Sequence, residues 1–136
     1  AEHTIRVQLD DDLLMARMDA RLIVQVIINI INNAIQYTQK GSCITLSACR
    51  KGEMAEVSIA DDGPGIPPEV REHLFDLFYT AEQGRADSRR GLGLGLNLCR
   101  SIVSAHGGCI SVSENRPKGS VFTFTLPLEE ARIDHV

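Results

Sequence analysis

The sequence predicts an α/β fold, a two-layer α/β sandwich in which helices pack on one face of a mixed, mostly antiparallel sheet. Two observations predict it. Segments that alternate apolar and polar residues, typical of strands, are interspersed with segments of helical periodicity, and turns rich in Gly or Pro separate them. The chain has 136 residues, of which 43% are hydrophobic, so it has the size of one domain. We expect this domain over residues 1–128, with a C-terminal tail over 129–136.

The first elements are two strands and a long helix. Residues 4–9 alternate and predict a strand, and residues 14–18 suggest a second, short one. A long helix is expected to begin after Asp19, a favourable N-cap residue, and to end near Thr38, before Gly41. Its many β-branched residues lower helix propensity, but its polar residues recur at helical spacing, which favours a helix.

The remaining elements follow from similar signals. Glycine and proline mark the turns between them, and a proline begins the shorter helix. In order, we expect a hairpin formed by 43–50 and 54–60, a loop over 61–68, a short helix over 68–78, a polar loop over 79–90, a helix over 94–106, and a strand pair formed by 109–114 and 120–126.

Composition excludes several classes of protein. Eighteen acidic residues against fourteen Lys and Arg give a net charge of −4, which argues against a general nucleic-acid or membrane-surface binder. No apolar run is long enough for a membrane span, and the N-terminus lacks a signal-peptide pattern. The absence of an initiating Met suggests a fragment of a longer protein. The four cysteines form no CxxC pair, so we expect reduced thiols rather than a metal site.

The predicted long helix carries a stripe of polar residues. Uncharged amides within an Ile-rich helix are costly unless a partner satisfies them. The stripe either faces solvent, or one of its Asn oxygens binds a cation such as Mg²⁺, which prefers hard oxygen ligands. Its members are Gln25, Asn29, Asn33, Gln36 and Tyr37.

Glycines cluster in two further motifs. Asp61 begins the run Asp-Asp-Gly-Pro-Gly-Ile, which is either an ordinary turn or a place where a planar ligand approaches the backbone and a carboxylate accepts its amine. Gly91, Gly93 and Gly95 open a helix at a cost in stability, and their free N–H groups suit an anion. The arginines before them are either solvated charges or phosphate ligands. They are Arg85, Arg89 and Arg90.

The order and spacing of these motifs resemble the N, G1, F and G2 boxes of the ATP-binding domain of sensor histidine kinases. The four boxes correspond to residues 29–38, 61–67, 75–78 and 91–96, and the segments 106–108 and 122–127 fit the same family. The sequence looks most like the KdpD-type potassium sensor kinases. The resemblance implies the Bergerat ATP-binding fold of the gyrase, chaperone, histidine kinase and MutL superfamily, with residues 79–90 as a lid over ATP.

The resemblance also implies roles for individual residues, with ATP and Mg²⁺ as cofactors. Asn33 would hold the Mg²⁺ that bridges the phosphates, and Asp61 would receive the adenine amino group. The other contacts are implied as follows: Gly63, Gly65 and Ile66 at the adenine, Tyr37 near the adenine or ribose, Gly91, Leu92, Gly93, Leu94 and Gly95 at the phosphates, and Phe75 and Phe78 as anchors of the lid.

Two positions depart from common patterns. Many histidine kinases carry Lys where this chain has Gln36, so we expect Arg89 or Arg90 to supply the cation at the terminal phosphate. Related ATPases usually carry Glu where this chain has Asn29, and an amide cannot take a proton from water at neutral pH. We therefore expect little ATP hydrolysis and transfer of the γ-phosphoryl group to a neutral His imidazole, with Asn29 orienting it.

None of the four histidines lies in the sequence setting of a phosphoacceptor. We therefore expect the acceptor on a separate dimerisation domain of the same sensor kinase, with a response regulator downstream. The chain would be the cytoplasmic domain of a membrane-bound kinase, with no nucleic-acid partner and no membrane insertion of its own. Two other functions fit the same fold: a nucleotide-gated protein-interaction module and an anti-sigma-type serine kinase.

Overall fold

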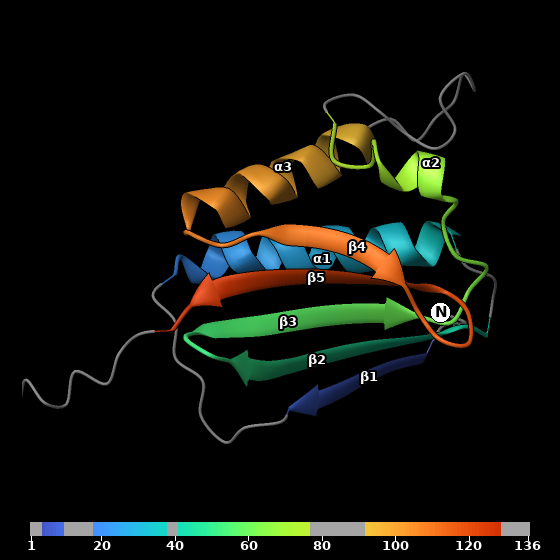
Figure 1. Ribbon diagram of the computed structural model, residues 1–136, viewed down its shortest axis with the longest axis horizontal. Helices are drawn as coiled ribbons and strands as arrows, with labels where there is room; N and C mark the ends of the chain where they lie inside the picture. Colours follow the sequence, from blue (N-terminus) through green and yellow to red (C-terminus); the bar gives the residue numbers. More distant parts are fainter. Residues whose placement is uncertain (1–3, 10–17, 38–40, 77–91, 129–136) are drawn as a thin grey trace, which may run out of the picture.

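The computed structural model describes residues 4–9, 18–37, 41–76 and 92–128, which form two layers (Figure 1). One layer is a five-stranded sheet of order β1-β2-β3-β5-β4, in which β1 pairs with β2 in parallel and the other pairs are antiparallel. The strands are β1 (Thr4–Leu9), β2 (Cys43–Lys51), β3 (Met54–Asp61), β4 (Ile110–Glu114) and β5 (Ser120–Pro127).

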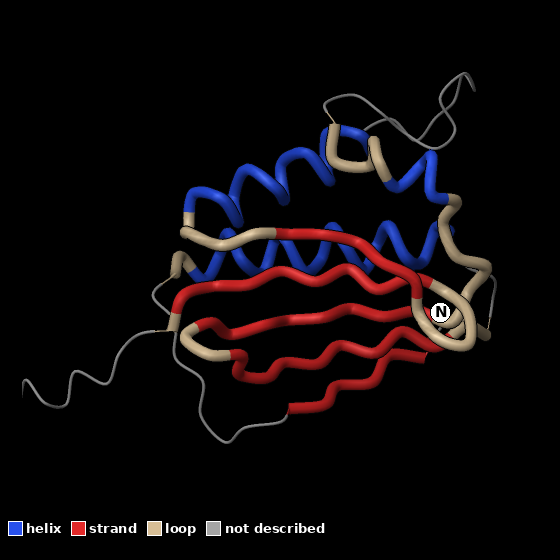
Figure 2. Tube along the Cα trace, in the orientation of Figure 1, coloured by secondary structure: helices blue, strands red, loops and turns tan. Residues whose placement is uncertain are grey.

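Helices α1 (Ala20–Tyr37) and α3 (Leu92–Ala105) form the second layer on one face of the sheet, and α2 (Pro68–Arg71) is a single turn (Figure 2). The predicted two-layer sandwich with a mixed, mostly antiparallel sheet is therefore confirmed. Within the described ranges, neither long helix is apolar enough over a sufficient length to cross a membrane.

Apolar residues at strand and helix spacing form the core between the layers. Phe122, Phe124 and Leu126 alternate along β5 and are buried, because side chains two residues apart share one face of a sheet. Ile23, Val26 and Ile30 meet them at the three- and four-residue spacing of a helix face. Burial of each such side chain contributes about 1.5–3 kcal/mol, so this face fixes the position of α1 on the sheet.

The predicted start of α1 is confirmed by its capping contacts. Asp19 Oδ1 accepts hydrogen bonds from the backbone N–H groups of Arg21 at 3.1 Å and Leu22 at 3.4 Å, which satisfies donors that have no partner within the helix. The Asp19 N–H in turn donates to His106 Nε2 at 3.0 Å, and His106 Nδ1 donates to the Ile102 carbonyl at 2.8 Å. His106 therefore links the end of α3 to the beginning of α1.

Two predicted helices have different limits in the structure. The helix expected over 68–78 ends at Arg71, and the chain continues to Asp76 in tight turns. In one of them the Asp76 N–H donates to the His73 carbonyl at 2.9 Å. Two successive residues of these turns, Leu74 and Phe75, enter the core. The helix expected from Leu94 begins two residues earlier, because the glycine run is part of it.

Other predicted limits differ little. The hairpin of β2 and β3 is confirmed, and β4 begins at Ile110 rather than at Cys109. Of the short strand expected over 14–18, only Met18 is described, and it does not belong to a strand. The other four residues lie outside the described ranges. The Leu128 N–H donates to the Glu53 carbonyl at 2.9 Å, and the predicted tail over 129–136 also lies outside those ranges.

Candidate functional site

Three elements carry predicted site residues toward one end of the molecule. β3 ends at Asp61, the C-terminal half of α1 carries Asn33, and α3 begins at Leu92, all on the right in Figure 1. The topology therefore gathers residues that are far apart in the sequence, as the resemblance implies. Gln36 and Tyr37 belong to the last turn of α1, and Leu92, Gly93, Leu94 and Gly95 to the first turn of α3. Arg89, Arg90, Gly91 and Phe78 lie outside the described residues.

The Asp61 carboxylate is buried and already held in place. Oδ1 accepts hydrogen bonds from the Gly63 N–H at 2.9 Å and the Ser120 N–H at 3.4 Å, and Oδ2 accepts from the Ser120 hydroxyl at 2.8 Å. A carboxylate offers about four lone-pair positions, so these bonds leave Oδ2 able to accept one more donor. That is the arrangement needed to receive a single exocyclic N–H.

The backbone around Asp61 is fixed by the loop between β4 and β5. The Asn115 side chain donates from Nδ2 to the Asp61 carbonyl at 2.8 Å. Gly119 has φ +110°, and a Cβ built there would collide with the same carbonyl oxygen, so only glycine allows this close approach. Ser120 and Asn115 have no signal in the local sequence, because their position opposite Asp61 depends on the pairing of β3 with β5.

Asn33 is buried and has no hydrogen-bond partner among the described residues. Its exposed fraction is 2%, and within the described residues neither Oδ1 nor Nδ2 has a hydrogen bond. A buried amide without partners costs about 1–3 kcal/mol, so such groups in native proteins call for an explanation. Among the residues that the structure describes, no group of three or more His, Cys, Asp or Glu side chains is placed to hold a metal ion. The free amide oxygen of Asn33 is a neutral, hard ligand that fits Mg²⁺.

Asn29, one turn before Asn33, has a partner. Gln25 Nε2 donates to Asn29 Oδ1 at 3.4 Å. Cys99 is fully buried and its Sγ donates to the Val26 carbonyl at 3.7 Å. Burial raises the pKa of the Cys99 thiol to about 11, and the Asn29 side chain opposes this rise.

The start of α3 combines two features that suit an anion. The first backbone N–H groups of a helix have no partner within it, and they carry the positive end of the helix dipole. A Cβ built at Gly95 would meet no atom of the described residues within 4 Å, so packing there does not require glycine. Glycine inside a helix costs up to about 1 kcal/mol relative to alanine, and open space beside it is consistent with room kept for a ligand.

Phe75 anchors the chain just before the predicted lid. Its ring is 9% exposed and packs edge-on against Phe122, with ring centroids 6.1 Å apart and planes at 82°. The Asn97 side chain of α3 donates from Nδ2 to the Phe75 carbonyl at 2.9 Å. The segment that leads to residue 77 is thus fastened both to the core and to α3.

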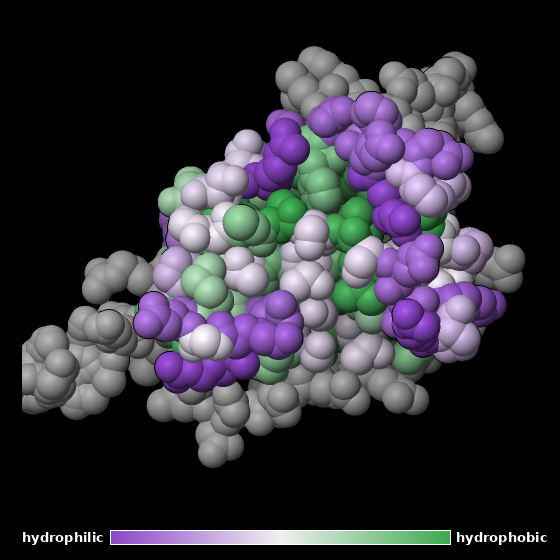
Figure 3. Space-filling view, viewed as in Figure 1, coloured by the Kyte–Doolittle hydropathy of each residue, from purple (hydrophilic) through white to green (hydrophobic). Residues whose placement is uncertain are grey.

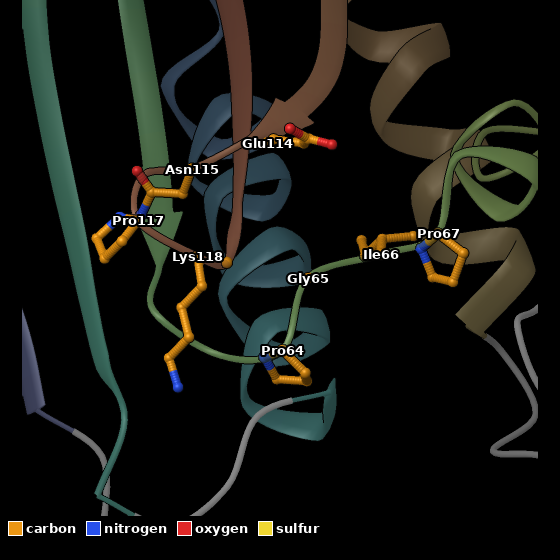
Figure 4. Close-up of a pocket in the computed structure, with 9 residues that line it drawn as sticks. Pro64, Gly65, Ile66, Pro67, Glu114, Asn115, Pro117 and Lys118 are labelled. Atoms are coloured by element: carbon orange, nitrogen blue, oxygen red, sulfur yellow. The ribbon is translucent and has the colours of Figure 1, made fainter.

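A pocket of about 530 Å³ lies beside this region, between two loops (Figure 4). Residues 64–67 line one side, and Glu114, Asn115 and residues 117–119 line the other. Of the predicted site residues it contains Gly65 and Ile66 but neither Asn33 nor Asp61, so it is a neighbour of the site and not its centre. In Figure 3 the parts of this end that belong to α2 and to the β4–β5 loop are strongly hydrophilic, with more apolar surface between them.

Comparison with known proteins supports the arrangement. The family described as histidine kinase-, DNA gyrase B-, and HSP90-like ATPase matches residues 18–130. The sensor protein KdpD of Clostridium acetobutylicum is 42% identical over 127 residues, which cover 93% of this chain and 14% of that protein. The adaptive-response sensory kinase SasA of Crocosphaera subtropica is 46% identical over 111 residues, which cover 81% of this chain and 28% of that protein.

Solved structures agree. The catalytic domain of histidine kinase ThkA superposes with a TM-score of 0.79 at 35% identity, covering 93% of this chain and 79% of that one. ThkA in complex with the response regulator protein TrrA gives a TM-score of 0.75 at 33% identity, and the match covers 93% of this chain and 34% of that one. Full-length ShkA in complex with AMPPNP gives a TM-score of 0.78 at 26% identity, and the match covers 93% of this chain and 26% of that one.

These comparisons confirm the resemblance to sensor histidine kinases. The KdpD relative also supports the resemblance to KdpD-type kinases, and SasA kinases match this chain at similar identity. The chain spans about a seventh of the length of the KdpD relative and under a third of the SasA relative. The family match covers most of the chain, and the fold agrees with histidine kinase catalytic domains over nearly its whole length. The chain belongs to the family of histidine kinase-, DNA gyrase B- and HSP90-like ATPases, as a histidine kinase catalytic domain.

Proposed function

We propose that this chain binds Mg-ATP and transfers its γ-phosphoryl group to a histidine on a separate dimerisation domain of the same sensor kinase. The observation that carries the proposal is the buried Asn33 carboxamide, which lacks a hydrogen-bond partner within the described residues. Asn33 lies in the C-terminal half of α1. Its amide oxygen is a hard ligand of the kind that Mg²⁺ prefers, so we assign to it the Mg²⁺ that would neutralise charge on the phosphates.

Asp61 provides the other end of the proposed nucleotide site. With one position on Oδ2 free, its carboxylate can accept the adenine amino group while Ser120 and Gly63 hold it in place. Gly63, Gly65 and Ile66 follow it and would lie along the base, and Tyr37 would lie near the adenine or ribose. Guanine carries a carbonyl oxygen where adenine carries its amino group, so this contact would favour ATP over GTP.

The phosphates would lie at the glycine-rich start of α3. The N–H groups of its first turn supply donors, and we assign contacts to Gly91, Leu92, Gly93, Leu94 and Gly95. Gln36 is uncharged at the position where many relatives have Lys, so the cation at the terminal phosphate is assigned to Arg89 or Arg90 of the proposed lid, residues 79–90. These assignments follow from the resemblance and remain predictions.

The reaction breaks the bond between the γ-phosphorus and its bridging oxygen, and it forms a bond from phosphorus to an imidazole nitrogen of the acceptor. Such transfer depends mainly on positioning and on charge neutralisation. Asn29 cannot remove a proton from water at neutral pH, which disfavours hydrolysis and leaves the phosphoryl group for the imidazole. Asn29 would instead orient the acceptor by hydrogen bonding.

The proposed partners follow from this reaction. Besides the dimerisation domain, a response regulator would receive the phosphoryl group from the histidine, and the ThkA–TrrA complex is a solved example of such a pair in a similar protein. We place the chain in the cytoplasmic part of a membrane-bound sensor kinase, where ATP is available.

The test combines this chain with a dimerisation domain that carries the acceptor His and with ATP labelled at the γ-phosphate. We expect acid-labile label on the acceptor, none after its His is replaced by Ala, and negligible phosphate release by the chain alone. Acid-stable phosphoserine would instead identify a serine kinase. Nucleotide binding without transfer to any His-bearing domain would identify a nucleotide-gated interaction module.

A further inference from the structure

The loop between β4 and β5 contacts the predicted adenine loop at two places. The Asn115 N–H donates to the Gly119 carbonyl at 3.0 Å, which closes the loop. Asn115 Nδ2 and the Gly119 backbone both approach the Asp61 carbonyl, Nδ2 by a hydrogen bond at 2.8 Å. Gly119 also lies beside Gly65, since a Cβ built on Gly65 would be 3.4 Å from the Gly119 carbonyl oxygen (Figure 4). The loop therefore touches both ends of the segment predicted to hold the base.

Regular pairing of β3 with β5 ends just before Asp61. The last paired residues are Ala60 and Val121, so continued pairing would set Asp61 opposite Ser120. At this point side chains take part in the contact. The Ser120 N–H reaches Asp61 Oδ1 at 3.4 Å, and the Asp61 carbonyl accepts from Asn115 Nδ2. The carboxylate and the backbone of Asp61 are thus held by two different residues of the β4–β5 strand pair.

The chemistry of its partners fixes the orientation of the Asn115 carboxamide. Oδ1 accepts from the Arg116 N–H at 2.9 Å, and Nδ2 donates to the Asp61 carbonyl. A backbone N–H can only donate and a carbonyl oxygen can only accept, so both bonds require the same one of the two flipped forms of the amide. Aspartate at this position would keep the bond from Arg116 but would turn a second oxygen toward the Asp61 carbonyl.

We propose that Asn115 is a positioning residue for adenine recognition and acts through Asp61. This inference rests on the proposed function, in which the Asp61 carboxylate receives the adenine amino group. Such a hydrogen bond depends on distance and angle, so the backbone that carries the carboxylate must be held in place. Without the Asn115 donor, the Asp61 carbonyl loses its bond, and the end of β3 shifts toward another donor. The carboxylate then moves away from the position that fits the amino group.

Two nucleotides separate this role from a general effect on the fold. Purine ribonucleoside triphosphate is ATP with a hydrogen in place of the exocyclic amino group, so it cannot make the Asp61 contact. For the unsubstituted chain, calorimetric titration in the presence of Mg²⁺ should show about tenfold tighter binding of ATP, the value of one hydrogen bond to a charged group. Because both nucleotides are measured on the same variant, a general disturbance of the site would weaken both alike.

Three variants complete the experiment. Asn115→Asp keeps the shape of the side chain and removes the donor, and Asn115→Ala removes the donor without adding charge. In both we expect the preference for ATP to fall roughly three- to tenfold, while affinity for the analogue changes less than about twofold. Arg116→Gln is the control, because it changes the net charge by the same amount as Asn115→Asp and keeps the Arg116 N–H. Arg116 is exposed, and its substitution should leave the preference unchanged.

Each contrary outcome has a distinct meaning. An unchanged preference for ATP in both Asn115 variants would overturn the inference and leave the proposed function intact. Equal losses of affinity for both nucleotides would reduce Asn115 to a structural role and would also overturn it. So would a fall in Arg116→Gln as large as that in Asn115→Asp, because charge alone would then explain the effect. Equal affinity of the unsubstituted chain for both nucleotides would remove the proposed Asp61 contact and this inference together.

Discussion

Asp61 and Asn33 are both buried polar side chains at the same end of the molecule, but their surroundings differ. The Asp61 carboxylate accepts hydrogen bonds from Gly63 and Ser120, whereas Asn33 has none within the described residues. Asp61 therefore contributes to folding before any ligand arrives, while Asn33 costs stability until a partner satisfies it. We interpret the difference as a preformed base-recognition contact beside a metal and phosphate contact that the ligand completes.

The largest expected effect is at Asp61. Asp61→Ala leaves the Gly63 N–H and the Ser120 hydroxyl without their acceptor in a buried place, so we expect a loss of about 3–5 kcal/mol in the free energy of unfolding, together with loss of ATP binding. Urea denaturation measures the first and calorimetric titration the second.

Asp61→Asn is the matched control. Its amide oxygen still accepts from Gly63 and its N–H can donate to Ser120, so we expect stability within about 1 kcal/mol of the original. It would also turn an N–H toward the adenine amino group, so affinity for ATP should fall at least about tenfold. If Asp61→Asn bound ATP unchanged, Asp61 would not be the adenine contact.

The next effect concerns Cys99, which is fully buried and donates from Sγ to the Val26 carbonyl of α1. Burial raises the pKa of its thiol from 9.0 to about 11, so the unfolded chain loses this proton at lower pH than the folded one. The stability that this difference provides is complete below about pH 9 and is lost as pH rises to about 11, a change on the order of 2–3 kcal/mol. Urea denaturation across this range should show a steeper loss for the original chain than for Cys99→Val. Parallel losses would show that Cys99 does not titrate with folding.

The smallest effect is expected at Gly95. Alanine favours a helix over glycine by up to about 1 kcal/mol, and a Cβ at this position meets no atom of the described residues within 4 Å, so Gly95→Ala should stabilise the chain by that amount. Because the same space would be filled by the phosphates, its affinity for ATP should decrease. A thermal melt with and without Mg-ATP measures both effects. A variant that is more stable and also binds ATP normally would remove Gly95 from the site.

Features with local signals could be predicted from the sequence. The cap at Asp19, the alternation at Phe122 and Phe124 and the hairpin at Gly52 each depend on residues close together in the chain, and the structure contains all three. The resemblance placed Asn33 and Asp61 in a site, and the structure brings them to the same end of the molecule.

Contacts between distant segments could not be predicted in the same way. Ser120 meets Asp61 because β5 pairs with β3, and Cys99 meets Val26 because α3 packs on α1. Neither contact has a signal in the local sequence. The end of the short helix at Arg71 and the tight turns from there to Asp76 also have no signal in the local sequence. The roles of Arg89 and Arg90 stay predictions, since both residues lie outside the described ranges.

Asn33→Leu tests the central claim most directly, because leucine has the same number and branching of heavy atoms as asparagine and removes both polar amide atoms. Denaturation of the original and substituted chains should be compared with and without Mg-ATP. Without nucleotide we expect Asn33→Leu to be as stable as the original or up to about 2 kcal/mol more stable, since an unsatisfied buried amide has been removed. With Mg-ATP at about 100 times its dissociation constant, only the original should gain about 2.7 kcal/mol. Destabilisation of Asn33→Leu by more than about 2 kcal/mol, or an undiminished gain with Mg-ATP, would contradict the account.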